Sequence, residues 1–399
     1  MKLLDTNTKN KVLRSMINIL DQRQDEIIKA NKKDLEIFGE TQGAMYDRLI
    51  VDNNKVEDMI RAVKEVLEQE DPVNQVISHT NLESGLDITN KTAPFGNIMI
   101  IYESRPDVTI EAAVLAFKAN NKIYLKGGKE ANYSNKVLVE CWHQALMENG
   151  LEKNWIELLQ LNRTKTQNFL KNPPEKLDLI VPRGGERLIS FVKEHATGAV
   201  LVSGRGNNFL YVSRNADPEI AKKVILNAKT HKISGCNALD KVLVDKNLPD
   251  YQNILKQLQQ LLKENGVEIV VDKDTREILE DENLVPSEDT WYEEFLAKKI
   301  VVGSVENVDE AVAKINKYSG GHSAAIISTE KEEAINFMEQ VDSAAVYHNA
   351  STRFTDGGQM GVGAELAIST DKLHHRGPLG LKQLVTNKYY VLGEGHIRE

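Results

Sequence analysis

Residues 97–127 read NIMIIYESRPDVTIEAAVLAFKANNKIYLKG, and this stretch sets the expected fold. Its two ends, NIMIIYE (97–103) and KIYLKG (122–127), are short runs rich in β-branched and aromatic residues, which is typical of buried strands. Between them, VTIEAAVLAFKAN is an amphipathic stretch of helical length. A strand, a helix and a second strand in this order require a crossover connection, which predicts a mostly parallel sheet.

The same alternation continues on both sides of this unit. Further strand-like runs are WIELLQL (155–161), LDLIVP (177–182) and NFLYVS (208–213), and the stretches SNKVLVECWHQALMENG and GGERLISFVKEHA between them are amphipathic. Upstream, residues 8–30 and 46–69 carry apolar side chains at three- and four-residue steps, which predicts a layer of charged, solvent-facing helices. We therefore expect a doubly wound, nucleotide-type α/β domain.

A second alternation of strands and helices begins after Cys236. The strand-like runs are KVLVD (241–245), VEIVVD (267–272), SAAIIS (323–328) and AAVYHNA (344–350). The helix-like runs among them are YQNILKQLQQLLKENG, VENVDEAVAKINKYSGG and EKEEAINFMEQ. This pattern predicts a second α/β unit from about residue 232 to residue 383.

Two segments fit neither unit. SGLDITNKTAP (84–94) and TNKYYVLGEGHIRE (386–399) are polar and alternating, which is typical of edge strands. Because an edge strand leaves backbone donors and acceptors unpaired, both segments would need covering.

The composition excludes several classes of protein. The apolar fraction of 41% and the charged fraction of 27% are ordinary for a globular protein. A net charge of −9 and the lack of a polybasic block argue against nucleic-acid binding. The apolar runs are too short to span a bilayer, and the first residues do not resemble a signal peptide. We expect a soluble, cytoplasmic protein without a membrane partner.

The chain has two cysteines, Cys141 and Cys236, which do not make a disulfide framework. Cys141 lies on one face of a helix-like stretch with Val137 and Leu146, so we interpret it as a small core residue. Cys236 lies four residues past the expected end of a helix that starts at Asp217–Pro218, and just before a strand.

Two features of the surroundings favour a reactive Cys236. The stretch Ser234-Gly235-Cys236-Asn237 is a glycine-bearing junction between elements, which places a thiol for access. Lys229, His231 and Lys232 lie within seven residues of Cys236, and cationic neighbours stabilise a thiolate. Position alone leaves both interpretations open: a nucleophile, or a small buried residue.

Glycine pairs follow two of the expected strands. Gly127-Gly128 follows the strand at 122–126, and Gly184-Gly185 follows the strand at 177–182 and opens a helix. Neither pair matches a known phosphate loop, so tight turns are an equal interpretation. Ligands of open α/β sheets bind beyond the carboxyl ends of strands, and anions favour helix N-termini.

The stretch HNASTRFTDGGQMGVGAE (348–365) is an unusually polar, glycine-rich loop. Arg353 lies within it, and an arginine can hold a carboxylate or phosphate with two parallel hydrogen bonds. The alternative for any single arginine is a solvated surface residue. His374 and His375 are adjacent and no metal-ligand spacing occurs, so we expect no metal site.

Six pieces of the sequence, in order, resemble the gamma-glutamyl phosphate reductase family of the aldehyde dehydrogenase superfamily. They are IYESRPDVTIEAA, LKGGKEA, VPRGGERLI, NAKT followed by CNALDKVLV, YHNASTRFTDGG, and GAELAISTDKLHHRGPLGLKQL. The resemblance runs from about residue 95 to the C-terminus, and the helical N-terminal region is compatible with it. The STRFTDGG and HHRGPLGL pieces point to this family within the superfamily.

The resemblance implies an aldehyde dehydrogenase-like fold and a reaction in proline biosynthesis. The reaction is the NADPH-dependent reduction of L-glutamyl 5-phosphate to L-glutamate 5-semialdehyde with release of phosphate, through a thioester on Cys236. Hydrolytic relatives carry a water-activating glutamate in a stretch that reads SGRGNN (203–208) in this chain and holds no carboxylate. That difference suits a reductase, because water attacking the thioester would waste it.

The resemblance also assigns roles to residues. The implied catalytic residue is Cys236, the implied substrate-binding residues are Arg105, Asn349, Ser351 and Arg353, and the implied cofactor-binding residues are Lys126, Gly127, Gly184, Gly185 and Glu294.

The implied domain organisation has three parts. The cofactor-binding domain takes residues 1–83 and 95–231, the catalytic domain takes 232–383, and a small β-strand oligomerisation arm takes 84–94 and 384–399. Pairing across subunits in a homodimer or homotetramer would cover the arm's edges. A functional association with glutamate 5-kinase is a further expectation.

Two departures from the family flank the expected active site. His231-Lys232-Ile233-Ser234 stands where many relatives have Gln-Arg-Pro, and Asn208-Phe209 stands where they commonly have Cys-His. Two other hypotheses follow: a related cysteine-dependent aldehyde or acyl-phosphate dehydrogenase with another substrate, and a catalytically silent relative that kept the fold.

Overall fold

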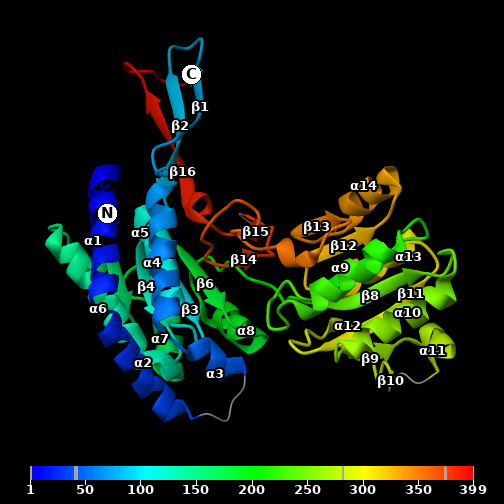
Figure 1. Ribbon diagram of the computed structural model, residues 1–399. Coiled ribbons are helices and arrows are strands. Elements are labelled where there is room, and N and C mark those ends of the chain that lie inside the picture. Colours follow the sequence, from blue (N-terminus) through cyan, green and yellow to red (C-terminus); the bar gives the residue numbers. More distant parts are fainter. Residues whose placement is uncertain (1, 40–43, 281–282, 373–374, 399) are drawn as a thin grey trace. The chain divides into compact units, whose positions relative to one another are not determined.

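The structure is a computed structural model, and it describes residues 2–39, 44–280, 283–372 and 375–398 (Figure 1). These residues form two compact units. Within the described ranges, unit 1 takes Met1–Val202, Gly361–Ala367 and Leu379–Glu399, and unit 2 takes Ser203–Met360 and Ile368–Pro378. Among the helices in these ranges, none is long and apolar enough to cross a membrane.

Unit 1 contains a four-stranded parallel sheet in the order β5-β4-β3-β6. Its strands are β3 (Asn97–Tyr102), β4 (Lys122–Lys126), β5 (Ile156–Leu158) and β6 (Leu179–Arg183). Its longer helices are α1 (Thr6–Gln22), α2 (Gln24–Phe38), α4 (Asn53–Glu68), α5 (Asp107–Lys118), α6 (Asn132–Glu148), α7 (Arg163–Lys171) and α8 (Glu186–His195). The short helices of unit 1 are α3 (Ala44–Leu49), η1 (Lys129–Ala131), η2 (Lys153–Trp155) and η4 (Leu381–Gln383).

Helices cover both faces of this sheet. Successive strand residues point to opposite faces, so Ile98 and Ile100 pack in one core with α1, α4, α5 and α6. Met99 and Ile101 pack in the other core, with Leu170 of α7 and Val192 of α8. The sheet is therefore doubly wound, and the carboxyl ends of its strands lead into the β–α connections.

A separate antiparallel sheet of unit 1 consists of β1 (Val76–Asn81), β2 (Asp87–Pro94) and β16 (Val385–Leu392) in that order. It is drawn as the extended ribbon that holds the C-terminal strand in Figure 1. Nearly all residues of β1 and β16 are exposed. The strand-like patterns at 84–94 and 386–399 are thus confirmed as paired strands, and β1 is a third strand that we did not expect.

Unit 2 contains a seven-stranded parallel sheet in the order β10-β9-β11-β8-β7-β12-β13. Its strands are β7 (Asn208–Val212), β8 (Leu239–Asp245), β9 (Glu268–Val271), β10 (Asn283–Leu284), β11 (Lys299–Val305), β12 (Ser323–Ile327) and β13 (Ala345–His348). Its helices are α9 (Pro218–Thr230), α10 (Tyr251–Glu264), α11 (Lys273–Leu279), α12 (Asp289–Tyr292), α13 (Val308–Tyr318), α14 (Lys331–Gln340) and η3 (Thr352–Phe354). A small antiparallel pair, β14 (Ile368–Ser369) and β15 (Gly377–Pro378), completes the unit.

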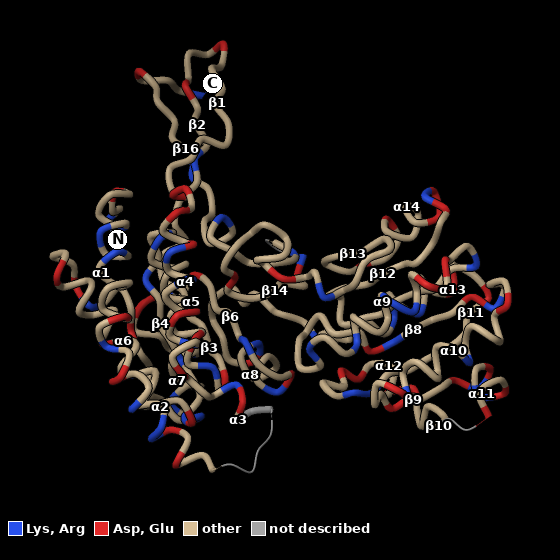
Figure 2. The backbone as a smooth tube through the Cα atoms, in the orientation of Figure 1, with Lys and Arg blue, Asp and Glu red and all other residues tan. Residues whose placement is uncertain are grey.

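The second sheet is also covered on both faces. Leu210 and Val242 pack in a core with α9 and α10, whereas Phe209 and Leu243 pack in a core with α12, α13 and α14. Figure 2 shows both signs of charge mixed along outer helices such as α6 and α13, as is typical of solvated helix faces. The prediction of a mixed α/β fold with parallel sheets is confirmed.

The boundary between the units differs from the one that we expected. Residues 203–231 belong to unit 2, because β7 pairs with β8 on one side and with β12 on the other. Residues 361–367 and 379–383 belong to unit 1, where Leu366 and Leu381 are buried in its core. The helix predicted at 8–30 is two helices that meet at Arg23.

Candidate active site

Cys236 lies in the segment that connects α9 to β8 of unit 2, and it is half-buried. The helix before it begins as predicted, because the side chain of Asp217 accepts hydrogen bonds from the backbone N–H groups of Glu219 and Ile220. The helix ends at Thr230, and β8 begins at Leu239. The thiol is therefore on a short connection between two well-anchored elements.

The glycine-rich stretch 203–208 passes directly against the backbone of Cys236. A Cβ atom on Gly206 would lie 2.0 Å from the carbonyl oxygen of Cys236 and 2.6 Å from its Cα. No side chain fits at that separation, so this close approach requires glycine. The stretch that lacks a carboxylate therefore lies beside the candidate nucleophile.

Asn208, at the start of β7, fixes the main chain at the thiol-bearing residue and just after it. Its side-chain nitrogen Nδ2 lies 2.8 Å from the carbonyl oxygen of Cys236, 2.6 Å from that of Ala238 and 2.8 Å from that of Gly206. Its Oδ1 accepts from the backbone N–H of Ser323 at 3.0 Å. Because Nδ2 serves these carbonyls, it is committed to holding the loop.

Arg353 lies next to the Cys236 loop. A Cβ atom on Gly235 would lie 2.6 Å from its Nη1, and its Nε lies 3.4 Å from Nδ1 of His231. Burial lowers the pKa of Arg353, and the neighbouring Cys236 and Asp356 oppose that shift. The structure thus brings together the predicted nucleophile and the predicted anion-binding arginine.

Hydrogen bonds in both directions join the Arg353 segment to the Cys236 loop. The amide Nδ2 of Asn237 donates to the carbonyl oxygens of Arg353 at 3.2 Å and Thr355 at 2.9 Å. In return, the hydroxyl of Thr352 donates to the carbonyl oxygen of Asn237 at 2.8 Å. These bonds are buried or partly buried, so they fix the guanidinium segment relative to the thiol.

One expected cation serves a different purpose. Lys229 is completely buried, and its ammonium lies 2.8 Å from the Asp240 carboxylate in an ion pair. Burial lowers the pKa of Lys229, opposed by this pairing with Asp240. The proposal that Lys229 supports the thiolate is therefore wrong in its detail.

Cys141 differs from Cys236 as expected. It is fully buried in the core of unit 1, and burial raises the pKa of its thiol to about 11. A thiol that stays protonated is a poor nucleophile, so the prediction of a core residue is confirmed.

The other predicted substrate residues of the 348–365 loop have local partners. Asn349 adopts a positive φ of 54°, and its side chain exchanges hydrogen bonds with the backbone N–H and carbonyl of Ser328. Ser351 is buried, and its hydroxyl accepts from the backbone N–H of Arg353 at 3.3 Å. Both shape the loop around Arg353. His374 lies outside the described residues.

Glu294 lies in the connection between α12 and β11, and it is half-buried. The backbone on both sides of it is held by buried side chains from β7 and β8, among them Lys241, which donates to the carbonyl oxygen of Glu293 at 2.7 Å. Sequence reasoning missed Asn207 and Lys241, and it noted Asn208 only as a departure from the family. Lys241 left a signal, since it is a charged residue in the otherwise apolar run KVLV.

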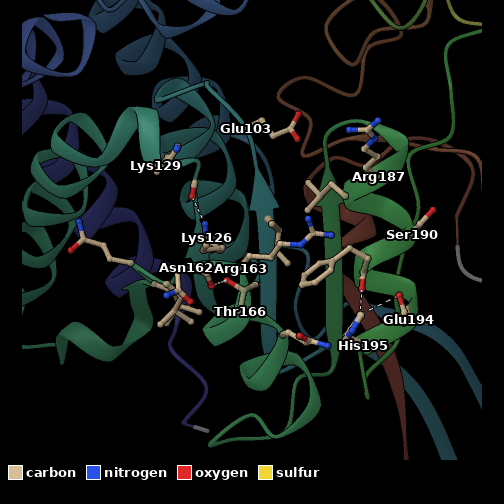
Figure 3. Close-up of a pocket in the computed structure, with 18 of the residues that line it drawn as sticks. Glu103, Lys126, Lys129, Asn162, Arg163, Thr166, Arg187, Ser190, Glu194 and His195 are labelled. Carbon is tan, nitrogen blue, oxygen red and sulfur yellow. Dashed lines mark hydrogen bonds and ion pairs between the residues drawn. The ribbon is translucent and has the colours of Figure 1, made fainter. Parts of the chain in front are cut away.

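Unit 1 carries a pocket of about 1130 Å³ beyond the carboxyl ends of β3, β4 and β5 (Figure 3). Lys126 and Gly127, both predicted, line it. The side-chain nitrogen of Lys126 donates to the carbonyl oxygen of Gly127 at 2.7 Å, and burial lowers the pKa of this lysine. A position at the strand ends is where open α/β sheets bind nucleotides.

Helix α8 forms the other wall of this pocket, with Arg187, Ser190 and His195 on it (Figure 3). Gly185 is the N-cap of α8, so the predicted Gly184-Gly185 pair forms the turn from β6 into the helix. A Cβ atom on Gly184 would lie 2.8 Å from the carboxyl carbon of Glu103, whereas one on Gly185 would meet open space. The N-terminal turn of α8 therefore offers backbone N–H groups to an anion.

Sequence reasoning missed the floor of the pocket. Arg163 at the start of α7 lies over the ring of Phe191 on α8, with 5.3 Å from its guanidinium carbon to the ring centroid. The lining carries the cationic side chains of Lys126, Lys129, Arg163 and Arg187 and the carboxylates of Glu103, Glu186 and Glu194. Both signs of charge are therefore present, and an anionic ligand would have to contact the cationic part.

Arg105, the remaining predicted substrate residue, lies in unit 1 at the start of α5. Its Nη2 lies 3.1 Å from the carboxylate of Asp107, which also pairs with Lys55 at 2.8 Å. Burial alone would raise the pKa of Asp107, but Arg105 and Lys55 outweigh it and hold the pKa well below its ordinary value.

Comparisons with known proteins agree with this geometry. The model of the aldehyde dehydrogenase family matches residues 1–276 and 282–365. A gamma-glutamyl phosphate reductase of Dictyoglomus turgidum is 40% identical over 402 residues, covering 100% of this chain and 96% of that protein. The crystal structure of gamma-glutamyl phosphate reductase from Thermotoga maritima is 42% identical, with a TM-score of 0.95 over 99% of this chain and 95% of that chain.

A more distant match shows the fold alone. An engineered glycolyl-CoA reductase with bound NADP⁺ is 17% identical, with a TM-score of 0.66 over 98% of this chain and 92% of that chain.

Proposed function

The chain belongs to the aldehyde dehydrogenase family and, within it, to the gamma-glutamyl phosphate reductases, and we propose that it reduces L-glutamyl 5-phosphate with NADPH. The products are L-glutamate 5-semialdehyde and inorganic phosphate, and the reaction passes through a thioester on Cys236. The protein thereby serves proline biosynthesis in the cytoplasm.

One observation carries the proposal. Cys236 is half-buried on a loop that Arg353 adjoins, and the stretch beside the thiol, residues 203–208, holds no carboxylate. A thiol next to a guanidinium suits attack on an anionic acyl group, because the cation stabilises the thiolate and attracts the substrate. Because residues 203–208 hold no carboxylate, this stretch supplies no general base that would activate water against the acyl-enzyme.

Each covalent step balances on the atoms of this site. The Cys236 thiolate attacks the acyl carbon, the bond from carbon to the phosphate oxygen breaks, and phosphate leaves with the electron pair. When bound, the nicotinamide supplies the hydride that converts the thioester to the alkoxide form of a thiohemiacetal. The carbon–sulfur bond then breaks, which releases the aldehyde and regenerates the thiolate.

The pocket of unit 1 is large enough for a dinucleotide. Its volume of about 1130 Å³ and the cationic side chains within its mixed lining suit a phosphate-bearing ligand, and the N-terminal turn of α8 suits a pyrophosphate. Lys126 and Gly127 would hold the adenosine side, and Gly184 and Gly185 would allow the pyrophosphate to approach. The family resemblance assigns Glu294 to the nicotinamide ribose.

The loop around Arg353 would bind the glutamyl phosphate. Arg353 is suited to a two-pronged contact with a carboxylate or phosphate. Asn349 and Ser351 would shape the loop around it, as their backbone contacts indicate. Arg105 is a further anion-binding candidate of unit 1.

The β1-β2-β16 sheet would pair with a second copy of the chain. Val76, Ile77, Tyr389, Val391 and Leu392 are between 53% and 68% exposed on it. A three-stranded sheet needs a buried face for stability, which a partner subunit would supply. We expect a homo-oligomer on this ground.

The test is the reverse reaction, the phosphate-dependent oxidation of glutamate 5-semialdehyde. Its rate is measured from the formation of NADPH. Cys236→Ser should abolish the rate, whereas the matched variant Cys141→Ser should keep it. The assay is run with NADP⁺ and with NAD⁺, and with several aldehydes, each in the presence and absence of phosphate. A substantial rate in Cys236→Ser, or a phosphate-independent rate with another aldehyde, would refute the proposal.

A further inference from the structure

Two consecutive asparagines at the start of β7 serve two different parts of unit 2. Both are completely buried. Asn208 holds the Cys236 loop through the contacts described above. Asn207 instead donates from Nδ2 to the carbonyl oxygens of Trp291 at 2.7 Å and Tyr318 at 2.9 Å. Successive side chains of an extended chain point in opposite directions, so adjacent amides can reach separate segments.

Lys241 on β8 links Asn207 to the segment around Glu294. Its ammonium donates to Oδ1 of Asn207 at 2.9 Å and to the carbonyl oxygen of Glu293 at 2.7 Å. It also lies 4.0 Å from the ring centroid of Phe295, in a cation–π contact. The Asn207 amide thus makes three hydrogen bonds, and the Lys241 ammonium makes two hydrogen bonds and a cation–π contact.

A third side chain holds the same segment from its other end. Oδ2 of Asp240 accepts from the backbone N–H of Phe295 at 3.2 Å, while Oδ1 of Asp240 accepts from Lys229 at 2.8 Å. The chain is therefore held at the carbonyl of Glu293 and at the N–H of Phe295, one residue before and one residue after Glu294. The contacts with β7 and β8 therefore set the position of the Glu294 backbone, from which the carboxylate extends.

A buried ammonium is expensive unless it is hydrogen-bonded, and burial lowers the pKa of Lys241 to about 7. An apolar residue of similar length would fill the same space in β8 without that expense. What the ammonium adds is directed bonds to Asn207 and to the backbone of Glu293.

We propose that Asn208 is the positioning residue for the Cys236 loop, and that Asn207 and Lys241 are positioning residues for the Glu294 segment. Both segments are then fixed to the same end of β7 through adjacent side chains. The inference rests on the proposed function for the roles of Cys236 and Glu294. It explains why an asparagine can stand at position 208 next to the nucleophile.

The test compares two variants with two readouts that need no turnover. The first readout is the rate at which iodoacetamide alkylates Cys236, located by peptide mapping, and the second is the Kd of NADPH from fluorescence titration. Asn208→Ala should slow alkylation and kcat by about 10- to 100-fold and leave the NADPH Kd within about twofold. Lys241→Met should raise the NADPH Kd and KM by about tenfold and leave alkylation within about twofold.

Asn207→Ala should behave as Lys241→Met does, and Asn208→Ser, which keeps one donor, should fall between the wild type and Asn208→Ala. The serine variant also serves if the alanine variant does not fold. Asn253→Ala and Lys256→Met, on exposed sites of unit 2, are the matched controls and should change neither readout. Thermal unfolding is measured for every variant.

The inference would be overturned if each variant changed both the alkylation rate and the NADPH Kd in proportion to its loss of thermal stability. It would also be overturned if neither quantity changed in any variant. Failure of the proposed function is a separate outcome. If no glutamyl substrate turns over, alkylation and NADPH binding still report on the two segments. If NADPH does not bind the wild type, the assigned role of Glu294 is overturned together with that of Lys241.

Discussion

Cys236 and Cys141 occupy opposite environments for the same chemical group. Cys236 is half-buried near the Arg353 guanidinium, whereas Cys141 is enclosed by the core of unit 1, where burial raises its pKa to about 11. Nucleophilic attack needs the thiolate and a path for the electrophile. Access and charge therefore favour Cys236 over Cys141 as the proposed nucleophile.

Replacing Arg353 should weaken both substrate binding and thiol reactivity. We expect Arg353→Met to raise the KM of the acyl substrate by about 10- to 100-fold, because a charge-assisted, two-pronged contact is lost. Iodoacetamide should also alkylate Cys236 more slowly than in the wild type. Arg353→Lys should recover the alkylation rate and only part of the KM, since it restores the charge but not the planar fork. An unchanged KM in Arg353→Met would refute the role of this arginine.

Lys241 should make stability depend on pH. Burial holds its folded-state pKa at about 7, against 10.5 for an ordinary lysine, in the presence of the nearby Asp240, Lys229, Glu293 and Glu294. Between these two values the unfolded chain binds more protons than the folded chain, so this residue makes the free energy of unfolding rise with pH.

Lys241→Met should remove that contribution. The slope of unfolding free energy against pH, measured by urea unfolding between about pH 7 and 10.5, should be smaller in the variant by at most about 1.4 kcal/mol per pH unit. Lys256→Met, on the exposed side of α10, should keep the wild-type slope. Equal slopes in the wild type and Lys241→Met would show that Lys241 does not titrate in this window.

At the scale of elements, most strands of the two parallel sheets could be predicted because each is a short apolar run between turn residues, whereas β1, β10 and β11 were missed. The run NFLYV of β7 was found in this way, but its unit was not, because a buried strand carries no local signal of which sheet it joins. Arg353 stood out as a cation in a long polar loop. Asn207 did not stand out, and Asn208 did so only as a departure from the family, because the role of a buried amide depends on long-range partners that the sequence does not show.

The start of β7 provides a sharp test of the close approach between the 203–208 stretch and the nucleophile loop. Gly206→Ala would place a Cβ atom 2.0 Å from the carbonyl oxygen of Cys236, so one backbone segment must move. We expect the free energy of unfolding to fall by about 1–3 kcal/mol, and Cys236 alkylation and turnover to fall with it.

Gly185→Ala is the control for Gly206→Ala, because its Cβ atom would meet open space and its backbone suits any residue. It should fold with wild-type stability. If the pyrophosphate binds at this turn, Gly185→Ala should still weaken NADPH binding, which titration would detect. Wild-type stability and reactivity in Gly206→Ala would contradict the described packing.

At the scale of the whole molecule, the β1-β2-β16 sheet is the part whose apolar side chains a single chain leaves exposed. Both β1 and β16 are exposed along almost their whole length and carry apolar side chains. The double variant Val391→Asp, Leu392→Asp should therefore prevent assembly through this sheet. The molar mass of the protein in solution, measured by sedimentation or light scattering, should fall. Met147→Asp, an equally exposed apolar position on α6, should leave the mass unchanged. An unaltered mass in the arm variant would refute assembly through this sheet.

The reaction as a whole depends on a thioester that water attacks slowly. With glutamate 5-semialdehyde and NADP⁺ but no phosphate, acylation of Cys236 can occur while the release step lacks its acceptor. The absence of a carboxylate in residues 203–208 should make hydrolysis slow.

Rapid mixing under these phosphate-free conditions, combined with mass spectrometry of the Cys236 peptide, tests the central claim most directly. We predict a stoichiometric burst of NADPH, a glutamyl adduct on Cys236 and none on Cys141, and renewed turnover when phosphate is added. Continuous turnover without phosphate, or a burst without an adduct on Cys236, would contradict it.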